Sequence, residues 1–370
     1  MQSSSPPSSF SETSQSQITV RAPTNIALIK YWGKQDKYFN LPLNSSISLT
    51  VDITKFFTET TINFLPTPEI IFYLNNKKAK ITNRIQQVIN TIKIQAEPKL
   101  RHKGLCIISN NNFPTAAGMA SSASGLAALT FALAKLYQIN LTMEELSAIA
   151  RLGSGSASRS LFGGLVKWEK GEKHENSTSK NLYEKTYWPE LRLLVVVLDS
   201  RKKKVSSTDA MMRKSDLLMK RSCEVVPENI KSLEFAFMNK DFPKLCEVVM
   251  AESDSLHEVI NESGVDYLNE NSYRMKAMVN FFNMPTVRSA YTFDAGPNVW
   301  ILIKKSEVNN FLSLILNHFL IQYDKLDLEE NFDQGRFKLL QCYAKRKIER
   351  IIETQVSNTG PIIKPILEKL

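Results

Sequence analysis

Apolar and polar residues alternate in several segments of the chain, and this period of two predicts β-strands. The clearest case is Ile47–Ile53, in which every second residue is apolar. The most apolar run, Leu191–Leu198, predicts a strand that is buried on both faces. Strands are also predicted to start at Ile18 and to lie within residues 56–74, Leu105–Ser109, Leu165–Glu169 and Tyr291–Ile303.

Other segments carry apolar residues at helical spacing. Residues 82–95 form one such segment, with Thr82 or Asn83 as the N-cap. A Thr142-x-x-Glu145 capping box predicts a helix over Leu141–Ala150. Further helices are predicted over roughly 208–222, 228–239, 241–258, 272–283, 306–319 and 336–354, and a polar loop over 170–184.

The composition narrows the class of protein. With 370 residues, the chain is long enough for one large or two ordinary globular domains. Its four cysteines form no C-x-x-C pair, which argues against a zinc site or disulfide framework and favours a reducing compartment, with the cytosol as the default. No apolar run is long enough to span a membrane. The Ser/Pro-rich residues 1–17 predict a disordered tail and not a secretory signal.

The formal net charge of +10 suits an anionic partner: nucleic acid, an anionic membrane or a polyphosphate ligand. A basic surface without a specific partner is the alternative. Aromatic residues do not interleave with the basic runs as a nucleic-acid-binding surface requires. We therefore expect no nucleic-acid partner and no membrane partner.

One segment has the composition of a phosphate-binding loop. Residues 112–137 start with Asn112, Phe113 and Pro114, turn through small residues and end in an apolar run of helical character. Small residues let backbone N–H groups approach a ligand, and a helix N-terminus attracts phosphate. A loop that enters a buried Ala-rich helix has the same composition, so the segment alone leaves both interpretations open. It is not a Walker A loop, because no Gly-Lys-Ser/Thr follows the turn.

Two lysines flank an aromatic pair early in the chain, at Lys30, Tyr31, Trp32 and Lys34. Such a group either binds a phosphate with an aromatic wall at its side or forms a solvated strand edge. Arg84 falls in the first turn of the predicted helix, where a cation opposes the helix dipole. This placement suggests that Arg84 serves something nearby, although a tolerated surface arginine is the more common case.

Hydroxyl and guanidinium groups come together in residues 151–164. Ser154 and Ser156 follow a glycine turn, and Ser156 shares a face with Arg159 if a helix starts near Ser156. This combination suits a carboxylate or a phosphate.

Further along, the charge run Arg201–Lys204 is either a solvated loop or a lid over phosphates. Asp294 lies in a predicted turn, where an Asp is usually a hydrogen-bonding turn former.

Six segments follow one another along the chain: APTNIALIKYWGK, NLPLNSSISLT, NNFPTAAGMASSASG, GSGSASRSLFGG, VSSTDAM and YTFDAGPN. In this order they closely resemble the mevalonate diphosphate decarboxylase family of the GHMP small-molecule kinase superfamily. The resemblance runs from about Ile18 to about Leu320, and more weakly to Val356. Met119 and Ser158 depart mildly from the family pattern, which usually has Leu and commonly Cys at these positions.

The resemblance implies a two-lobe α+β fold of the GHMP-kinase type with a deep cleft between the lobes. We expect residues 18–200 to form the N-terminal ATP-binding lobe and 201–356 the C-terminal lobe, with a boundary near 190–205. Residues 357–370 are expected to be a loose tail, and a return of the C-terminal segment to the first lobe stays open. Family members are commonly homodimers, so a homodimer is expected.

The resemblance also implies roles for individual residues. It makes Asp294 the catalytic carboxylate and counts Arg159, Ser122 and Lys30 as catalytic residues with it. The residues that match the family's substrate site are Tyr31, Trp32, Lys34, Arg84, Ser154, Ser156 and Arg159. Those that match its ATP site are Ser109, Asn112, Pro114, Ala116, Ala117, Gly118, Met119, Ala120, Ser121, Ser122, Lys203 and Ser206.

The reaction implied by the resemblance converts (R)-5-diphosphomevalonate and ATP to isopentenyl diphosphate, ADP, phosphate and CO₂, in the mevalonate pathway of isoprenoid and sterol biosynthesis. ATP brings Mg²⁺, and because the sequence shows no cage of carboxylates, we expect phosphates, water and serine hydroxyls to hold the ion. A kinase of the same superfamily that stops after phosphorylation is the near alternative, against which Asp294, Arg159 and Lys34 speak together. A basic RNA-binding protein is the alternative from another class.

Overall fold

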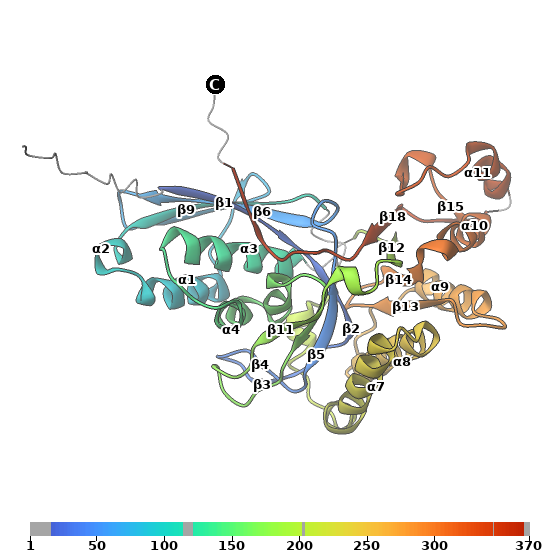
Figure 1. Ribbon diagram of the computed structural model, residues 1–370, viewed down its shortest axis with the longest axis horizontal. Coiled ribbons are helices and arrows are strands. Elements are labelled where there is room, and N and C mark those ends of the chain that lie inside the picture. Colours follow the sequence, from blue (N-terminus) through green and yellow to red (C-terminus); the bar gives the residue numbers. More distant parts are fainter. Residues whose placement is uncertain (1–15, 114–120, 202–203, 343, 366–370) are drawn as a thin grey trace, which may run out of the picture.

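The computed structural model describes residues 16–113, 121–201, 204–342 and 344–365. Sheets of six, four and five strands, with helices packed against them, give a mixed α+β molecule (Figure 1). This confirms the predicted fold class. None of the helices within these ranges is long and apolar enough to cross a membrane.

The first lobe is built on the six-stranded sheet. Its strands in spatial order are β19 (Ile362–Lys364), β1 (Gln17–Pro23), β6 (Phe57–Leu65), β9 (Gly104–Asn111), β7 (Ile70–Leu74) and β8 (Lys77–Lys78). The helices of this lobe are α1 (Asn83–Gln95), α2 (Pro98–Arg101), α3 (Ser121–Leu136) and α4 (Met143–Gly153). Three of them, α1, α3 and α4, bury their apolar faces in one core with the sheet (Figure 1).

Local sequence signals set the helix starts of this lobe. The Thr82 hydroxyl accepts a hydrogen bond from the backbone N–H of Ile85 and caps α1. The Thr142 and Glu145 side chains form the predicted capping box of α4. Both helix predictions are confirmed, with boundaries displaced by up to three residues at an end.

The four-stranded sheet lies between the lobes and consists of β11 (Ser179–Tyr183), β10 (Leu165–Trp168), β5 (Ser46–Thr50) and β2 (Asn25–Ile29). All residues of β2 and β5 are buried. A short hairpin of β3 (Lys34–Asp36) and β4 (Leu41–Pro42) follows β2. Because β11 occupies part of residues 170–184, the prediction of a loop over that whole range is wrong.

The second lobe is built on the five-stranded sheet of β13 (Ser289–Phe293), β14 (Val299–Lys304), β12 (Leu191–Val197), β18 (Arg350–Gln355) and β16 (Leu326–Asp327). Strand β12 is the central one and is buried along its whole length, as predicted. The helices of this lobe are α5 (Ser207–Ala210), α6 (Asp216–Lys220), α7 (Val226–Met238), α8 (Phe242–Glu262), α9 (Glu270–Phe282), α10 (Val308–His318) and α11 (Gln334–Gln341). Two short strands, β15 (Phe319–Leu320) and β17 (Arg346–Lys347), pair beside them.

The prediction of one helix over residues 336–354 is wrong. Of the described residues in this range, only those of α11 are helical, and residues 350–355 form β18 between β12 and β16. Ile351 and Ile352 are neighbours and both buried, because the two faces of this strand are both covered. A short apolar run of this kind has no period of two, so it cannot be told from a helix by spacing.

The predicted domain limits also differ from the structure at two places. Strand β12 was expected in the first lobe but belongs to the five-stranded sheet of the second lobe. Residues 362–364, expected to be part of a loose tail, form β19 and pair with β1, so the chain returns to the first lobe (Figure 1). At the other end, β1 begins at Gln17, inside the expected tail, and residues 1–15 lie outside the described ranges.

Candidate active site

A cavity of about 760 Å³ is lined by residues from both lobes. Most of the predicted site residues that the structure describes line it: Lys30, Tyr31, Trp32, Lys34, Arg84, Ser122, Ser154, Ser156, Arg159, Ser206 and Asp294. Residues far apart in the chain therefore meet at one place.

An ion pair joins the two lobes at this cavity. Lys30 follows strand β2 of the first lobe, and Asp294 follows strand β13 of the second. The Lys30 Nζ donates to Oδ1 of Asp294 at 2.7 Å. Lys30 is buried, whereas the Asp294 side chain is 32% exposed. Burial lowers the pKa of Lys30, and the neighbouring Asp294 carboxylate opposes that shift.

Arg159 presents a buried cation to the same cavity. A 3-10 helix over Gly155–Leu161 carries both Ser156 and Arg159, and residues three apart lie on one side of such a helix, as expected. Arg159 donates from Nε to the Ser48 hydroxyl at 3.0 Å and from Nη1 to the Ser46 hydroxyl at 2.6 Å. Burial lowers the pKa of Arg159 to about 10, so it stays charged at neutral pH.

Ser46 and Ser48 carry no role in the sequence analysis, where the alternation in β5 was interpreted only as a strand signal. All residues of β5 are buried, so the polar positions of the alternation do not face solvent. Hydroxyls hold Arg159, and no carboxylate of the described residues forms a salt bridge with it. Its charge is therefore available to an anionic ligand.

Three serines form a row along the cavity. The Ser122 and Ser154 hydroxyl oxygens are 3.3 Å apart, and those of Ser154 and Ser156 are 3.2 Å apart. Ser122 lies in the first turn of α3, whose N-terminus favours negative charge. Hydroxyls next to a helix N-terminus suit a phosphate group.

The Tyr31 ring packs edge-on against Trp168, with ring centroids 4.8 Å apart. Its hydroxyl oxygen is buried and has no hydrogen-bond partner among the described residues. Since buried polar groups are normally paired, this hydroxyl fits a role in holding a ligand.

Gly155 lies between these two rings, and we expect Gly155→Ala to weaken substrate binding. A methyl group there would lie 2.8 Å from ring carbons of both Tyr31 and Trp168, so at least one ring must move. We expect KM for the substrate to rise by about 10-fold or more, because displaced binding groups lose alignment. Gly125→Ala is the matched control, since a methyl group at Gly125 meets no atom within 4 Å. Equal KM values for both variants would contradict this expectation.

Lys34 and Arg84 add two further cations. Arg84, in the first turn of α1, donates from Nη2 to the Thr208 hydroxyl at 2.9 Å and so reaches from the first lobe to α5. Burial, with the charges of Arg84 and Lys37, lowers the pKa of Lys34 to about 8. Neither Lys34 nor Arg84 forms an ion pair with a carboxylate of the described residues, which is the arrangement that a diphosphate needs.

Ser206 caps α5 by accepting a hydrogen bond from the backbone N–H of Asp209. Lys204 and residues 206–209 line the cavity, so this segment lies where the sequence analysis placed either a solvated loop or a lid. Of the ATP-binding predictions, those on residues that the structure does not describe remain predictions: Pro114, Ala116, Ala117, Gly118, Met119, Ala120 and Lys203. The same holds for the side chain of Ser121.

Two predicted ATP-binding residues do not line the cavity. The Ser109 hydroxyl, on β9, lies 2.9 Å from the hydroxyl of Thr60 inside the first lobe. Asn112 accepts from the backbone N–H of Phe57 and donates to the carbonyl of Lys55. Both side chains make their hydrogen bonds near the end of β9, and their contact with ATP stays a prediction.

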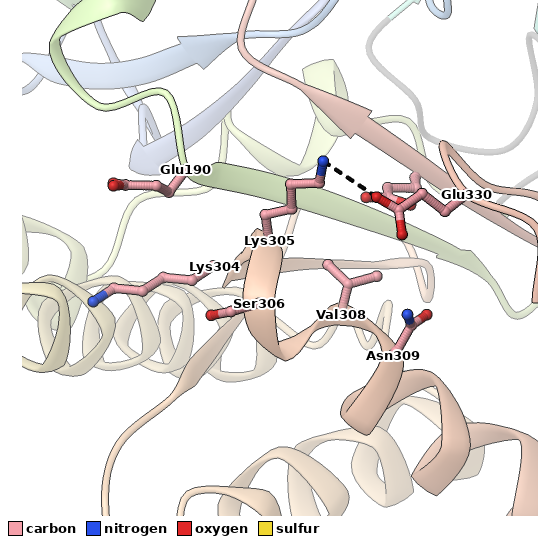
Figure 2. A pocket seen from close by; sticks show the side chains of 8 residues that line it. Glu190, Lys304, Lys305, Ser306, Val308, Asn309 and Glu330 are labelled. Atoms are coloured by element: carbon pink, nitrogen blue, oxygen red, sulfur yellow. Dashed lines mark ion pairs between the residues drawn. The ribbon is translucent and has the colours of Figure 1, made fainter.

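A second hollow, of about 590 Å³, lies at the start of β12 and the end of β14 (Figure 2). None of the predicted site residues lines it. Lys305 forms an ion pair with Glu330 at 3.2 Å, and Lys304 points away from Lys305 (Figure 2). Because Glu190 and Glu353 also line it, this hollow does not suit a polyanion.

Comparison with known proteins gives the same assignment over nearly the whole chain. The model of the diphosphomevalonate decarboxylase-like N-terminal domain matches residues 22–179, and that of the mevalonate 5-diphosphate decarboxylase C-terminal domain matches residues 193–364. The diphosphomevalonate decarboxylase of Candida albicans is 44% identical over 318 residues, which are 81% of this chain and 88% of that protein.

Solved structures are similar along almost their full length. Mevalonate diphosphate decarboxylase from Trypanosoma brucei has a TM-score of 0.85 at 33% identity, covering 96% of this chain and 99% of that chain. A structure described as MDDEF in complex with MVAPP, AMPPCP and magnesium has a TM-score of 0.79 at 32% identity, covering 95% and 99%.

Proposed function

The chain belongs to the diphosphomevalonate decarboxylase family, and we propose that the cavity between its lobes, with Lys30, Arg159 and Asp294, is the catalytic centre. The enzyme uses ATP and Mg²⁺ to convert (R)-5-diphosphomevalonate to isopentenyl diphosphate, ADP, phosphate and CO₂. The observation that supports the proposed site is the ion pair between Lys30 and Asp294 beside the buried cation of Arg159.

The first step is transfer of the γ-phosphoryl group to the tertiary 3-hydroxyl, which is otherwise a poor leaving group. Asp294 would accept the proton of that hydroxyl as the new P–O bond forms. The Lys30 ammonium donates to one oxygen of the Asp294 carboxylate and fixes its orientation. Ser122 would contact the ATP phosphates at the N-terminus of α3.

In the second step the C3–O bond breaks and phosphate leaves with the bonding electrons. The C–C bond to the carboxylate then breaks, its electron pair forms the new C=C bond, and CO₂ departs. This requires the carboxylate to stay ionised and aligned with the leaving C–O bond. Arg159, with its orientation fixed by Ser46 and Ser48, would hold the carboxylate.

The distant diphosphate of the substrate gives binding energy for this alignment. We propose that it is held by Tyr31, Lys34, Arg84 and Ser154.

Mg²⁺ neutralises charge on the ATP phosphates. Because the described residues contain no cluster of His, Cys, Asp or Glu that could hold a metal ion, hydroxyls such as that of Ser122 fit it, together with phosphates and water.

We expect kcat/KM to fall as the pH rises through about 8. The lowered pKa of Lys34 means that the free enzyme loses this positive charge above about pH 8, and an uncharged amine binds a diphosphate weakly. In Lys34→Arg the guanidinium stays charged, so this decline is expected to move to higher pH. The measurement is kcat/KM against pH for both proteins. An identical decline in both would assign it to another group.

A coupled assay tests the substrate and the product. Phosphate release is compared for diphosphomevalonate, phosphomevalonate and mevalonate, and CO₂ is measured in the same reactions. Equal amounts of phosphate and CO₂ from diphosphomevalonate support the proposed chemistry. A stable 3-phosphorylated product without CO₂ would instead indicate the kinase alternative.

We also propose that the protein is a homodimer and acts in the cytosol. The dimer is the state that the family resemblance implies, and the cytosol suits cysteines that form no disulfide among the described residues. Light scattering of the purified protein distinguishes a dimer from a monomer of 42.0 kDa. Imaging of a fluorescent fusion in cells tests the location.

A further inference from the structure

Buried groups hold the backbone of Lys30 on both sides. Oε1 of Glu252 accepts a hydrogen bond from the Lys30 backbone N–H at 2.9 Å. The Lys30 carbonyl accepts from Asn44 Nδ2 at 3.0 Å and from Arg221 Nη2 at 3.3 Å. These contacts come from three separate parts of the chain. They fix the backbone of Lys30 independently of the ion pair between its side chain and Asp294.

Arg221 and Glu252 also pair with each other. Nη2 of Arg221 donates to Oε1 of Glu252, and both side chains are almost fully buried. Oε2 of Glu252 accepts from Asn229 at 2.8 Å. A buried ion pair is weak evidence for stability, because desolvation offsets its attraction and an apolar pair of similar volume often serves as well. Stability is therefore a poor explanation for this pair.

The hydrogen bonds of Arg221 also argue against a purely stabilising role. Within the described ranges, its Nε and Nη1 make no hydrogen bond, although both are buried. The bonds it makes run from Nη2 to Glu252 and to the carbonyl of Lys30. The guanidinium thus lies where it binds the Lys30 carbonyl, although two of its own donor nitrogens remain without a partner among the described residues.

The helix that carries Arg221 has an unusual turn at this residue. Residues 216–238 are helical without a break, but Arg221–Val225 form a π-turn. Pro227 gives the physical reason, because it has no N–H to donate and its ring would clash with the carbonyl four residues earlier. Such turns are frequent at functional sites. Ser206–Asp209, which precede this helix in the chain, line the cavity.

We propose that Arg221 and Glu252 are positioning residues, which together hold the Lys30 backbone so that its ammonium meets Asp294. They connect two helical segments of the second lobe, residues 216–238 and α8, with a residue of the first lobe. This inference rests on the proposed catalytic role of Lys30. The inference goes beyond that role, because it assigns a function to two side chains that do not line the cavity.

Two double variants test this. In Arg221→Met/Glu252→Leu both charges are removed together, so neither is left buried and unpaired. We expect kcat to fall by about 10- to 100-fold, as a small misplacement of a catalytic group can cost this much, with KM near that of the wild type. Arg221→Met/Glu252→Gln keeps an acceptor for the Lys30 N–H but not the Arg221 donor to the Lys30 carbonyl, so we expect it to recover part of the activity.

Arg192 and Glu329 give the matched control. They form a mostly buried pair at 3.1 Å in the second lobe and do not touch Lys30. Arg192→Met/Glu329→Leu should keep kcat. An unchanged kcat in Arg221→Met/Glu252→Leu would overturn the proposal, as would an equal fall in the control pair. Lys30→Met tests the catalytic role of Lys30 separately from the positioning role of Arg221 and Glu252. If Lys30→Met retains activity, the proposed role of Lys30 itself fails.

Discussion

Asp294→Asn should lower kcat by about 10²–10⁴-fold, the usual contribution of a general base. Asparagine keeps the shape of the side chain but cannot take up the proton of the substrate hydroxyl. It also loses the charge that pairs with Lys30 at 2.7 Å. Because Asp294 is proposed to contact the reacting centre and not the diphosphate group, we expect ATP and diphosphomevalonate still to bind. Single-turnover kinetics and equilibrium titration measure the two effects separately.

Asp327 offers a control of the same chemistry. Its side chain is 31% exposed, close to the 32% of Asp294, and its carboxylate pairs with Lys55 at 2.5 Å. Asp327 does not line the cavity. Asp327→Asn should therefore leave turnover near that of the wild type. Near-normal turnover in Asp294→Asn would remove Asp294 from the proposed role.

Arg159→Ala should reduce kcat/KM by roughly 30- to 4000-fold, because truncating a buried, hydrogen-bonded charge partner costs about 2–5 kcal/mol. The loss should appear in both substrate binding and CO₂ release, since the guanidinium is proposed to hold the carboxylate that departs. An unchanged rate and KM would discredit that assignment.

Arg159→Lys sharpens this experiment. Lysine keeps the positive charge but lacks the planar fork that binds Ser46, Ser48 and a carboxylate at the same time. We expect binding to recover more than decarboxylation does, because charge alone attracts the substrate, whereas geometry controls the breaking C–C bond. Addition of guanidinium ions to Arg159→Ala should restore part of the CO₂ release.

Local signals in the sequence predicted local structure well. Thr82 and the Thr142–Glu145 capping box mark the starts of α1 and α4, because a cap depends on groups within three residues of one another. The same kind of reasoning was wrong for residues 336–354, where β18 is mostly buried and pairs along its two edges with β12 and β16. Spacing cannot report a partner strand that lies more than a hundred residues away.

The sequence alone determined which side chains are available for the chemistry and, through the resemblance of six segments, the family and the reaction. The tertiary structure decided their contacts. Lys30 and Asp294 are 264 positions apart, and Lys30 and Glu252 are 222 apart. The hydroxyls of Ser46 and Ser48 hold a cation only because β5 is buried beside the 3-10 helix that carries Arg159. Such pairings depend on strand order and on the packing of the two lobes, which no short stretch of residues encodes.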